Sequence, residues 1–377
     1  MSKMGRAQGA AFWVVLVTSS LVTIAHAARI DLQQFSSEVN TSVSRVEEQI
    51  SLELGLAFNF YSKSCPNAEK IISEAVSAAI QKDQGIAPGL LRIFFHDCFS
   101  QGCDASLLLN DGRGSELNDP ANASIRKSAL KLIDAIKTAL EGTCRGVVSC
   151  ADIITAATRD SIKLTGGPAF NVPLGRRDSF TRFSTGLLPG PSASFGDQLG
   201  RFQNFKLGTK DLVALASGGH TLGVAQCASF QQRITPNVDP KMDKNFASAL
   251  LKMCGSPSNT VGLDFWTPFK FDNQIYKNFI TGGALLQSDQ NMDQDQTAWG
   301  LVNTWAKDQA AFFRQFQESF IKMSQINPLS GNQGEIRRIC SRSNNAGLED
   351  VPEDVANGGE MEISVEPELI KQVTDEE

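Results

Sequence analysis

The stretch Leu91-Arg92-Ile93-Phe94-Phe95-His96-Asp97-Cys98 combines an apolar helical pattern with two chemically active side chains. On a helix, Arg92 and His96 are four positions apart and project from nearly the same face, separated by about 40°. A fixed cation beside a histidine suits chemistry in which the histidine moves a proton while the cation stabilises developing negative charge. Such a pair is more often a surface feature, but the neighbouring phenylalanines indicate a buried or pocket-lining surface.

On both sides of this stretch, the sequence predicts an all-α, mainly helical fold with long connecting loops. Apolar residues at three- and four-residue steps predict a helix after Pro66-Asn67 and further helices over 89–98, 129–140, 150–164, 195–205, 210–216, 274–281, 297–307 and 309–326. Extended patterns are scarce. The last segment carries an apolar stripe that fits a cofactor pocket but is far more often plain core, formed by Phe312, Phe313, Phe316, Phe320 and Met323.

Histidine is rare in this chain, which contains three. His26 lies in the expected signal peptide, so the mature chain keeps His96 and His220. His220 follows a short helical pattern and the pair Gly218-Gly219. A histidine in this setting is usually a loop or capping residue. Because few other soft ligands exist in the chain, His220 is also a candidate ligand for haem iron.

The N-terminus predicts export. Lys3 and Arg6 precede an apolar run that ends at Ala25-His26-Ala27, the anatomy of a signal peptide over residues 1–27. The run is too short and too polar for a membrane anchor. A polar leader over 28–55, a catalytic domain over 56–345 and an acidic, disordered tail over 346–377 are expected to follow.

Charge is concentrated in the tail. Of the net charge of −6, residues 348–377 carry eleven carboxylates against one lysine, so the rest of the chain is slightly positive. This composition gives no basic face for nucleic acid, and no later stretch has the length of a membrane span.

Eight cysteines remain after signal-peptide removal. An even number in an exported chain predicts four disulfides, although the sequence alone leaves their pairing open. No CxxC pair is present, so cysteine ligation of a metal is not expected.

Two acidic clusters have the oxygen-rich composition that calcium prefers. One spans residues 97–106, in which Asp97 and Asp104 alternate with hydroxyl and glycine residues. The other combines Thr221 with Asp264, Thr267 and Asp272. By themselves such runs are usually solvated turns.

Together these features resemble the secretory plant peroxidases, or class III haem peroxidases, from about Phe58 to Cys340. The resemblance is carried by Phe60-Tyr61 before Ser64-Cys65-Pro66, Gly89 through Ser106, Val148-Ser149-Cys150-Ala151-Asp152, Pro173 through Asp178, Asp211 through Thr221, Phe271-Asp272-Asn273 and Ser288-Asp289-Gln290.

The resemblance implies two lobes with haem b between them. His220 is implied as the axial iron ligand, with Asp289 accepting a hydrogen bond from its other nitrogen. His96 is implied as the distal general base and Arg92 as the stabiliser of separating charge. Asn122 would hold the far nitrogen of His96, and Glu116 would support that network.

The same resemblance implies a donor site, two calcium ions and four disulfides. Pro189 falls at the position that binds aromatic donors. The implied ligands are Asp97, Ser100, Gly102, Asp104 and Ser106 for one calcium, and Thr221, Asp264, Thr267, Lys270 and Asp272 for the other. The implied disulfides are Cys65–Cys144, Cys98–Cys103, Cys150–Cys340 and Cys227–Cys254.

One segment departs from the family pattern. Between Asn122 and Ile133-Asp134 the chain is about two residues longer and lacks an Arg-Gly-Phe sequence, which puts in doubt the haem-propionate contact normally made there. The chain also has two sequons, at Asn40 and Asn122. Asn122 is expected to be buried and without sugar, which leaves Asn40 as the better glycan candidate.

The implied activity is the reduction of hydrogen peroxide coupled to one-electron oxidation of small aromatic donors, by a secreted monomer of the cell wall or, through the tail, the vacuole. One alternative is a non-catalytic calcium and disulfide scaffold. A second is a zinc hydrolase using His96 and His220, which no HExxH motif supports.

Overall fold

The computed structural model describes residues 49, 52–110, 114–183, 186 and 188–345. The expected signal peptide, nearly all of the leader, the acidic tail and Asn40 lie outside these residues. The chain divides into two units, Met1–Glu53 and Leu54–Glu377, and the description below concerns the second.

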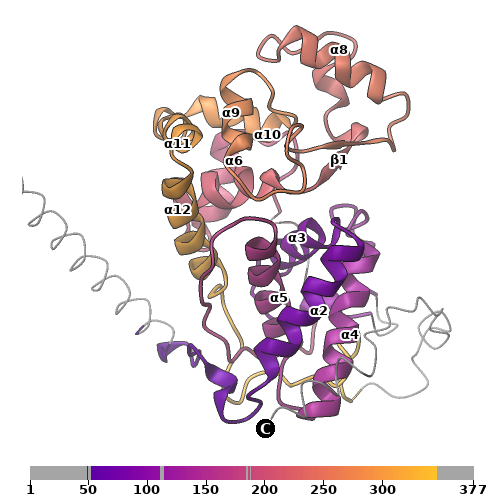
Figure 1. The fold of residues 1–377 in the computed structure, drawn as a ribbon, viewed down its shortest axis with the longest axis vertical. Helices are drawn as coiled ribbons and strands as arrows, with labels where there is room; N and C mark the ends of the chain where they lie inside the picture. Colours follow the sequence, from indigo (N-terminus) through magenta and orange to yellow (C-terminus); the bar gives the residue numbers. More distant parts are fainter. Residues whose placement is uncertain (1–48, 50–51, 111–113, 184–185, 187, 346–377) are drawn as a thin grey trace, which may run out of the picture. The chain divides into compact units, whose positions relative to one another are not determined.

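The prediction of a mainly helical fold is confirmed. Four long helices form one half of the unit (Figure 1): α2 Ala68–Lys82, α3 Ile86–Cys98, α4 Lys127–Thr143 and α5 Cys150–Leu164. α5 is the central helix, because its residues from Cys150 to Ile162 are all buried. Its N-terminus is capped by the Ser149 hydroxyl, which accepts from the amide of Asp152 at 3.1 Å.

The other half contains the remaining helices and both strands (Figure 1). These are α6 Phe195–Gln203, α7 Thr209–Leu212, α8 Lys244–Met253, α9 Gln274–Ile280, α10 Gln287–Gln290, α11 Gln296–Lys307 and α12 Gln309–Met323. Strands β1 Val224–Gln226 and β2 Thr260–Gly262 pair antiparallel, with Val224 opposite Gly262. The sequence analysis did not identify α8, whose buried face consists of Ala247 and Leu250 alone.

The phenylalanine stripe of α12 is core, as the pattern predicts. Phe312, Phe316 and Phe320 are each 0 % exposed. Phe320 stacks on Phe94 of α3 with ring centroids 4.4 Å apart. Burial of each ring is worth roughly 2–3 kcal/mol, so this contact fixes α12 against the helix that carries Arg92 and His96.

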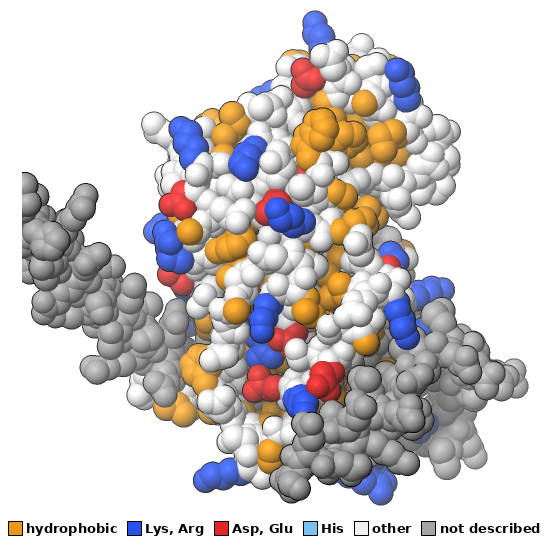
Figure 2. Space-filling model, in the orientation of Figure 1, with side chains coloured by type: hydrophobic (Ala, Val, Ile, Leu, Met, Phe, Trp, Pro, Cys, Tyr) orange, Lys and Arg blue, Asp and Glu red, His pale blue; other side chains and the backbone are white. Residues whose placement is uncertain are grey.

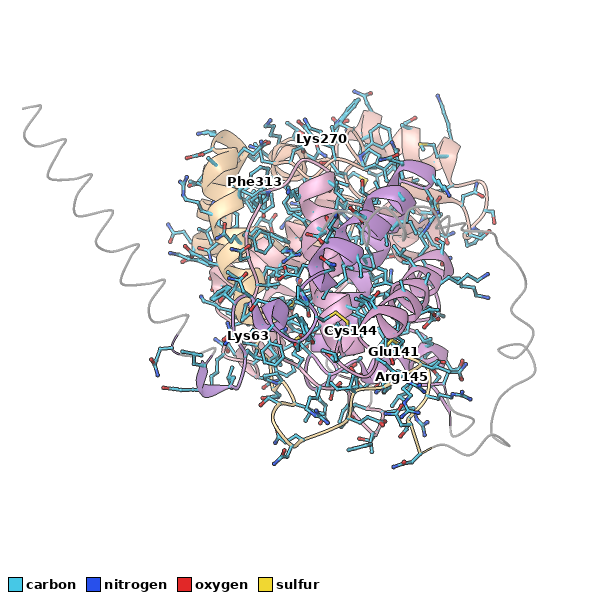
Figure 3. The ribbon with its side chains drawn as sticks, turned by 60° about the horizontal axis from the view of Figure 1, so that its bottom comes forward. Lys63, Glu141, Cys144, Arg145, Lys270 and Phe313 are labelled. Atoms are coloured by element: carbon cyan, nitrogen blue, oxygen red, sulfur yellow. A yellow bond between two sulfur atoms is a disulfide. The ribbon has the colours of Figure 1, made fainter. Side chains whose placement is uncertain are left out.

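All eight cysteines form disulfides, in four pairs. The pairs are Cys65–Cys144, Cys98–Cys103, Cys150–Cys340 and Cys227–Cys254. Figure 3 shows Cys144 beyond the end of α4, close to Glu141 and Arg145. The Cys150–Cys340 bridge joins residues 190 positions apart and therefore constrains the unfolded chain strongly.

The surface carries mixed charge. On the face drawn in Figure 2, basic and acidic side chains are interspersed. Hydrophobic side chains gather on the part that bears α8 and β1 (Figure 2), and the exposed apolar residues of these two elements are Val224, Leu251 and Met253. Within the described residues, no helix is long and apolar enough to cross a membrane.

Candidate active site

Helix α3 presents Arg92 and His96 on one face. Pro88 lies in its first turn, where a missing amide proton costs no helical hydrogen bond. The helix is fixed on α5 by the Thr158 hydroxyl, which donates to the carbonyl of Leu90 at 3.1 Å. An aromatic environment surrounds this face, since Phe95 stacks on Phe99 at 4.3 Å next to His96.

The loop that precedes α4 holds both distal side chains. The Nδ1 atom of His96 lies 2.5 Å from Oδ1 of Asn122, and Nη2 of Arg92 donates to the carbonyl of Ala121 at 2.9 Å. Asn122 is 2 % exposed, and its amide nitrogen donates to the main-chain carbonyl of Glu116 at 2.8 Å. Both the oxygen and the nitrogen of the Asn122 side-chain amide are thus hydrogen-bonded within the protein.

Glu116 supports this network through two routes. Its backbone carbonyl orients Asn122, while its carboxylate accepts from the Ser100 hydroxyl at 3.0 Å and from the Phe183 amide at 2.8 Å. Ser100 also donates to the carbonyl of His96 at 2.9 Å. The carboxylate of Glu116 therefore contacts the end of α3 rather than the Asn122 side chain.

His96 is suited to accept a proton. Burial, followed by the nearby Arg92 charge, lowers its pKa from 6.5 to about 3, although the hydrogen bond to Asn122 raises it. With Nδ1 held by Asn122, Nε2 makes no hydrogen bond to any described residue. Nε of Arg92 is likewise buried without a partner in the described part of the chain. This face of α3 therefore carries two nitrogen atoms, His96 Nε2 and Arg92 Nε, that make no hydrogen bond to a described residue.

His220 follows an irregular helix. α7 continues not as the expected α-helix to residue 216 but as a π-helical turn over Val213–Ser217, in which the Gly218 amide donates to the carbonyl of Val213 at 3.0 Å. Such turns are frequent at functional sites. A Cβ on Gly218 would lie 2.2 Å from the Ala214 carbonyl and 2.5 Å from the Tyr276 hydroxyl, so glycine is required there.

Asp289 orients His220 from another element. Nδ1 of His220 lies 3.1 and 3.0 Å from the two carboxylate oxygens of Asp289, a residue of α10 that is 2 % exposed. The His220 side chain is 33 % exposed, and its Nε2 makes no hydrogen bond to a described residue. A histidine fixed through one nitrogen by a carboxylate is the usual arrangement of a metal ligand.

The His220 segment lies against α3. A Cβ on Gly219 would be 3.8 Å from the Leu91 side chain, and one on Gly223 would be 2.8 Å from Pro88. Gly223 also has a φ of 103°, which glycine adopts without strain. The two histidine-bearing segments are therefore neighbours across the two halves of the unit.

The distal oxygen cluster contains two buried carboxyl groups, Asp97 and Asp104. Asp97 accepts from the amides of Ala105 and Leu107 at 3.0 and 3.3 Å, yet burial and then the Asp104 charge raise its pKa well above 3.8. Burial raises the pKa of Asp104 to about 6. The Ser106 hydroxyl is buried without a partner among the described residues, and the Cys98–Cys103 disulfide closes the loop containing Ser100 and Gly102.

The proximal oxygen cluster unites residues that are far apart in sequence. The Thr221 hydroxyl donates to the carbonyls of Lys270 and Asp272 at 3.3 and 2.9 Å, and the Thr267 hydroxyl donates to the Asp272 carboxylate at 3.2 Å. Oδ1 of Asp264 accepts from the Thr267 amide at 3.2 Å.

Burial raises the pKa of Asp264, and its Oδ2 has no partner among the described residues. The Lys270 side chain, exposed at the surface (Figure 3), places Nζ 3.3 Å from the Asp272 carboxylate. No group of three or more histidine, cysteine or acidic side chains within the described residues is placed to hold a metal. A cation at either cluster would therefore depend on hydroxyl and carbonyl oxygens as well.

No hydrogen bond among the described residues links Pro189 to His96 or His220. Pro189 is partly exposed in a loop that is connected to the proximal side through the Ser288 amide, which donates to the carbonyl of Pro191 at 2.9 Å.

The sequence analysis did not identify the residues that contact the helical segment preceding His220. The Tyr276 hydroxyl donates to the carbonyl of Val213 at 3.0 Å within the π-helical turn, and burial, followed by the Asp289 charge, raises the Tyr276 pKa well above 10.0. The Ser319 hydroxyl donates to Asp211 at 2.7 Å. The glycine pair before His220 was the one available signal, because it indicates a close approach by another element.

Comparison with known proteins agrees with this arrangement. The family model described as peroxidase matches residues 72–308. The cationic peroxidase SPC4 of Sorghum bicolor is 43 % identical over 320 residues, which cover 82 % of this chain and 87 % of that protein. Peroxidase 12 of Arabidopsis thaliana is 42 % identical over 309 residues, covering 80 % and 86 %.

A third relative, peroxidase 4 of Vitis vinifera, is 42 % identical over 298 residues, covering 77 % of this chain and 92 % of that protein. Matches of this identity and coverage, together with the helical fold and four disulfides, show that the chain is a member of the peroxidase family, in its class III plant branch, and hence an oxidoreductase that acts on hydrogen peroxide.

Proposed function

We propose that this protein is a haem-dependent peroxidase that reduces hydrogen peroxide to water and oxidises phenolic or other small aromatic donors by one-electron steps. The observation that carries the proposal is that each of its two histidines is held at Nδ1 by a neighbouring side chain. Asn122 holds Nδ1 of His96 and Asp289 holds Nδ1 of His220, which leaves both Nε2 atoms available on neighbouring segments.

The residues present fit haem b. His220 Nε2 would bind the haem iron, and the Asp289 carboxylate would accept from Nδ1–H and increase the electron donation of the imidazole. The buried Nε of Arg92 without a partner fits a face that a cofactor covers. When bound, haem supplies the redox centre that exchanges two electrons with peroxide and one electron with each donor molecule.

The chain's own residues move the proton and stabilise charge. His96, with its pKa lowered to about 3, is neutral at physiological pH and accepts a proton from peroxide at Nε2. It then delivers that proton to the departing oxygen. The Arg92 guanidinium stabilises the negative charge that develops on this oxygen as the bond breaks.

We further propose two calcium ions. The distal ligands would be Asp97, Asp104, the Ser106 hydroxyl and the carbonyls of Ser100 and Gly102; the proximal ligands would be Thr221, Asp264, Thr267, Asp272 and the carbonyl of Lys270. Raised carboxylate pKa values and oxygens without hydrogen-bond partners at both clusters support this assignment, because a cation would stabilise the ionised carboxylates.

Export and donor binding complete the proposal. The signal-peptide pattern over residues 1–27 and four disulfides support a secreted enzyme of the cell wall, with the acidic tail as a vacuolar sorting segment in the alternative location. Pro189 would contact aromatic donors at the pocket edge, and the enzyme would act as a monomer.

The test is the visible spectrum of the purified protein before and after hydrogen peroxide. We expect a Soret band that changes on addition of peroxide and returns when a phenolic donor follows. A Soret band that does not respond would favour the non-catalytic scaffold, and no Soret band after haem reconstitution would contradict haem binding altogether. Zinc content would then test the hydrolase alternative.

A further inference from the structure

The segment that departs from the family pattern places a third basic residue on the active-site face. Arg126 ends the loop in which Ala121 and Asn122 hold Arg92 and His96. Helix α4 begins directly after it, at Lys127.

The Arg126 side chain lies directly on α3. A Cβ on Gly85 would be 2.3 Å from Cζ of Arg126 and 2.6 Å from its Nη1, and a Cβ on Gly89 would be 3.2 Å from its Cβ. Glycine at both positions leaves the space that this side chain occupies. No larger residue at position 85 could coexist with the guanidinium where it now lies.

Gly89 of α3 and Gly85, which immediately precedes this helix, lie on the same face as the catalytic pair. At 100° per residue, positions 85, 89, 92 and 96 fall within about 60° of one another. The guanidinium of Arg126 therefore extends the basic surface begun by Arg92 by about two turns toward the helix N-terminus.

One edge of this guanidinium is occupied and the other is not. Nε and Nη2 donate to the carboxylate of Asp83 at 3.1, 2.8 and 2.7 Å, and Nε also donates to the Ser128 hydroxyl at 3.0 Å. Nη1 makes no hydrogen bond to any residue that the structure describes. The Arg126 side chain is 44 % exposed, so a ligand can reach this nitrogen.

We propose that Arg126 binds a carboxylate at the edge of the active-site pocket through Nη1, the guanidinium nitrogen that Asp83 and Ser128 leave free. A planar guanidinium is the side chain best suited to a carboxylate. The carboxylate has two possible sources, a propionate of the bound haem or the acid group of an aromatic donor. The inference rests on the proposed haem site, because that site defines the α3 face as the pocket wall.

The experiment compares Arg126→Gln with Asp83→Asn in the full-length, haem-loaded protein. Asp83→Asn breaks the ion pair but keeps the guanidinium. It therefore measures the effect of losing the ion pair alone, without loss of the carboxylate-binding group. A Soret band in the parent protein is established first, because its absence would contradict the proposed function and not the role of Arg126.

The first arm measures the rate of cofactor transfer to apomyoglobin after loading with haem or with haem dimethyl ester, whose propionates are uncharged. If the propionate is the ligand, Arg126→Gln accelerates loss of haem roughly tenfold, the worth of one hydrogen bond between charged groups. Loss of the ester is expected to be nearly unchanged, and Asp83→Asn retains the preference of the parent for haem.

The second arm measures KM for a phenol with a carboxylate side chain and for a neutral phenol of similar size. If the donor acid is the ligand, Arg126→Gln raises KM for the anionic phenol roughly tenfold and leaves KM for the neutral phenol unchanged. The proposal is overturned if neither the cofactor ratio nor the KM ratio changes, or if Asp83→Asn changes the same ratio as much as Arg126→Gln does.

Discussion

Replacement of Asn122 by valine tests the orienting role proposed for this residue. Valine has a similar shape but forms neither of the two side-chain hydrogen bonds, to Nδ1 of His96 at 2.5 Å and to the Glu116 carbonyl at 2.8 Å. A net hydrogen bond is worth about 0.5–1.5 kcal/mol. Since only the His96 bond acts on the reacting face, the rate of reaction with peroxide should fall by roughly 2- to 13-fold.

This effect is smaller than that of removing the base itself. His96→Ala should slow the same step by roughly 100- to 10,000-fold. Because the hydrogen bond to Asn122 raises the His96 pKa, which is about 3, its loss lowers that pKa further. The acid limb of the pH–rate profile should therefore move to lower pH in Asn122→Val, while the rate at neutral pH decreases.

The assay is stopped-flow absorbance at the Soret band, with the haem-loaded fraction quantified for each variant. Thr155→Val is the control, because it removes a buried hydroxyl that donates to the Ala151 carbonyl at 2.9 Å on α5; it should leave the rate unchanged. An unaltered rate in Asn122→Val, or an acid limb displaced to higher pH, would refute the proposed orientation of His96.

The other predictions concern the iron ligand, calcium and glycosylation. His220→Ala should lose haem faster than His96→Ala, measured by transfer to apomyoglobin; equal retention would contradict ligation by His220. Calcium removal should lower Tm by roughly 5–10 °C, because a ligand at a hundred times its Kd contributes about 2.7 kcal/mol, and unchanged melting after verified removal would count against both sites. Asn122 should carry no sugar in active enzyme despite its sequon, since its amide nitrogen is buried and donates to Glu116. Glycopeptide mass spectrometry checks this, and high occupancy would show that the distal network is built differently.

Much of the helical framework could be predicted from the sequence. The expected helix over 150–164 coincides with α5, and the start of the helix at residue 309 matches α12. These segments have strong apolar periodicity, which depends on nearby residues alone. α8 was missed because its buried face is too small to give such a pattern.

The helix over 210–216 was predicted with the wrong geometry after Leu212. Its local sequence favours a continuous α-helix, but Tyr276 donates to the Val213 carbonyl and the turn widens to a π-helix. A hydrogen-bond partner 63 residues away cannot be predicted from the sequence of the helix itself. Tertiary contact therefore overrode the helical preference of the segment.

The sequence by itself determined that Arg92 and His96 share a helix face and that the cysteines are even in number, because both depend on spacing or count. Only the tertiary structure decided what these residues can do. The partners of the two histidines lie 26 and 69 residues away, and the low pKa of His96 depends first on burial. The same holds for Arg126, whose side chain packs against Gly85, just before α3, and against Gly89 within it. Hydrogen-bond distance and desolvation are properties of atoms brought together by folding, so spacing along the chain cannot specify them.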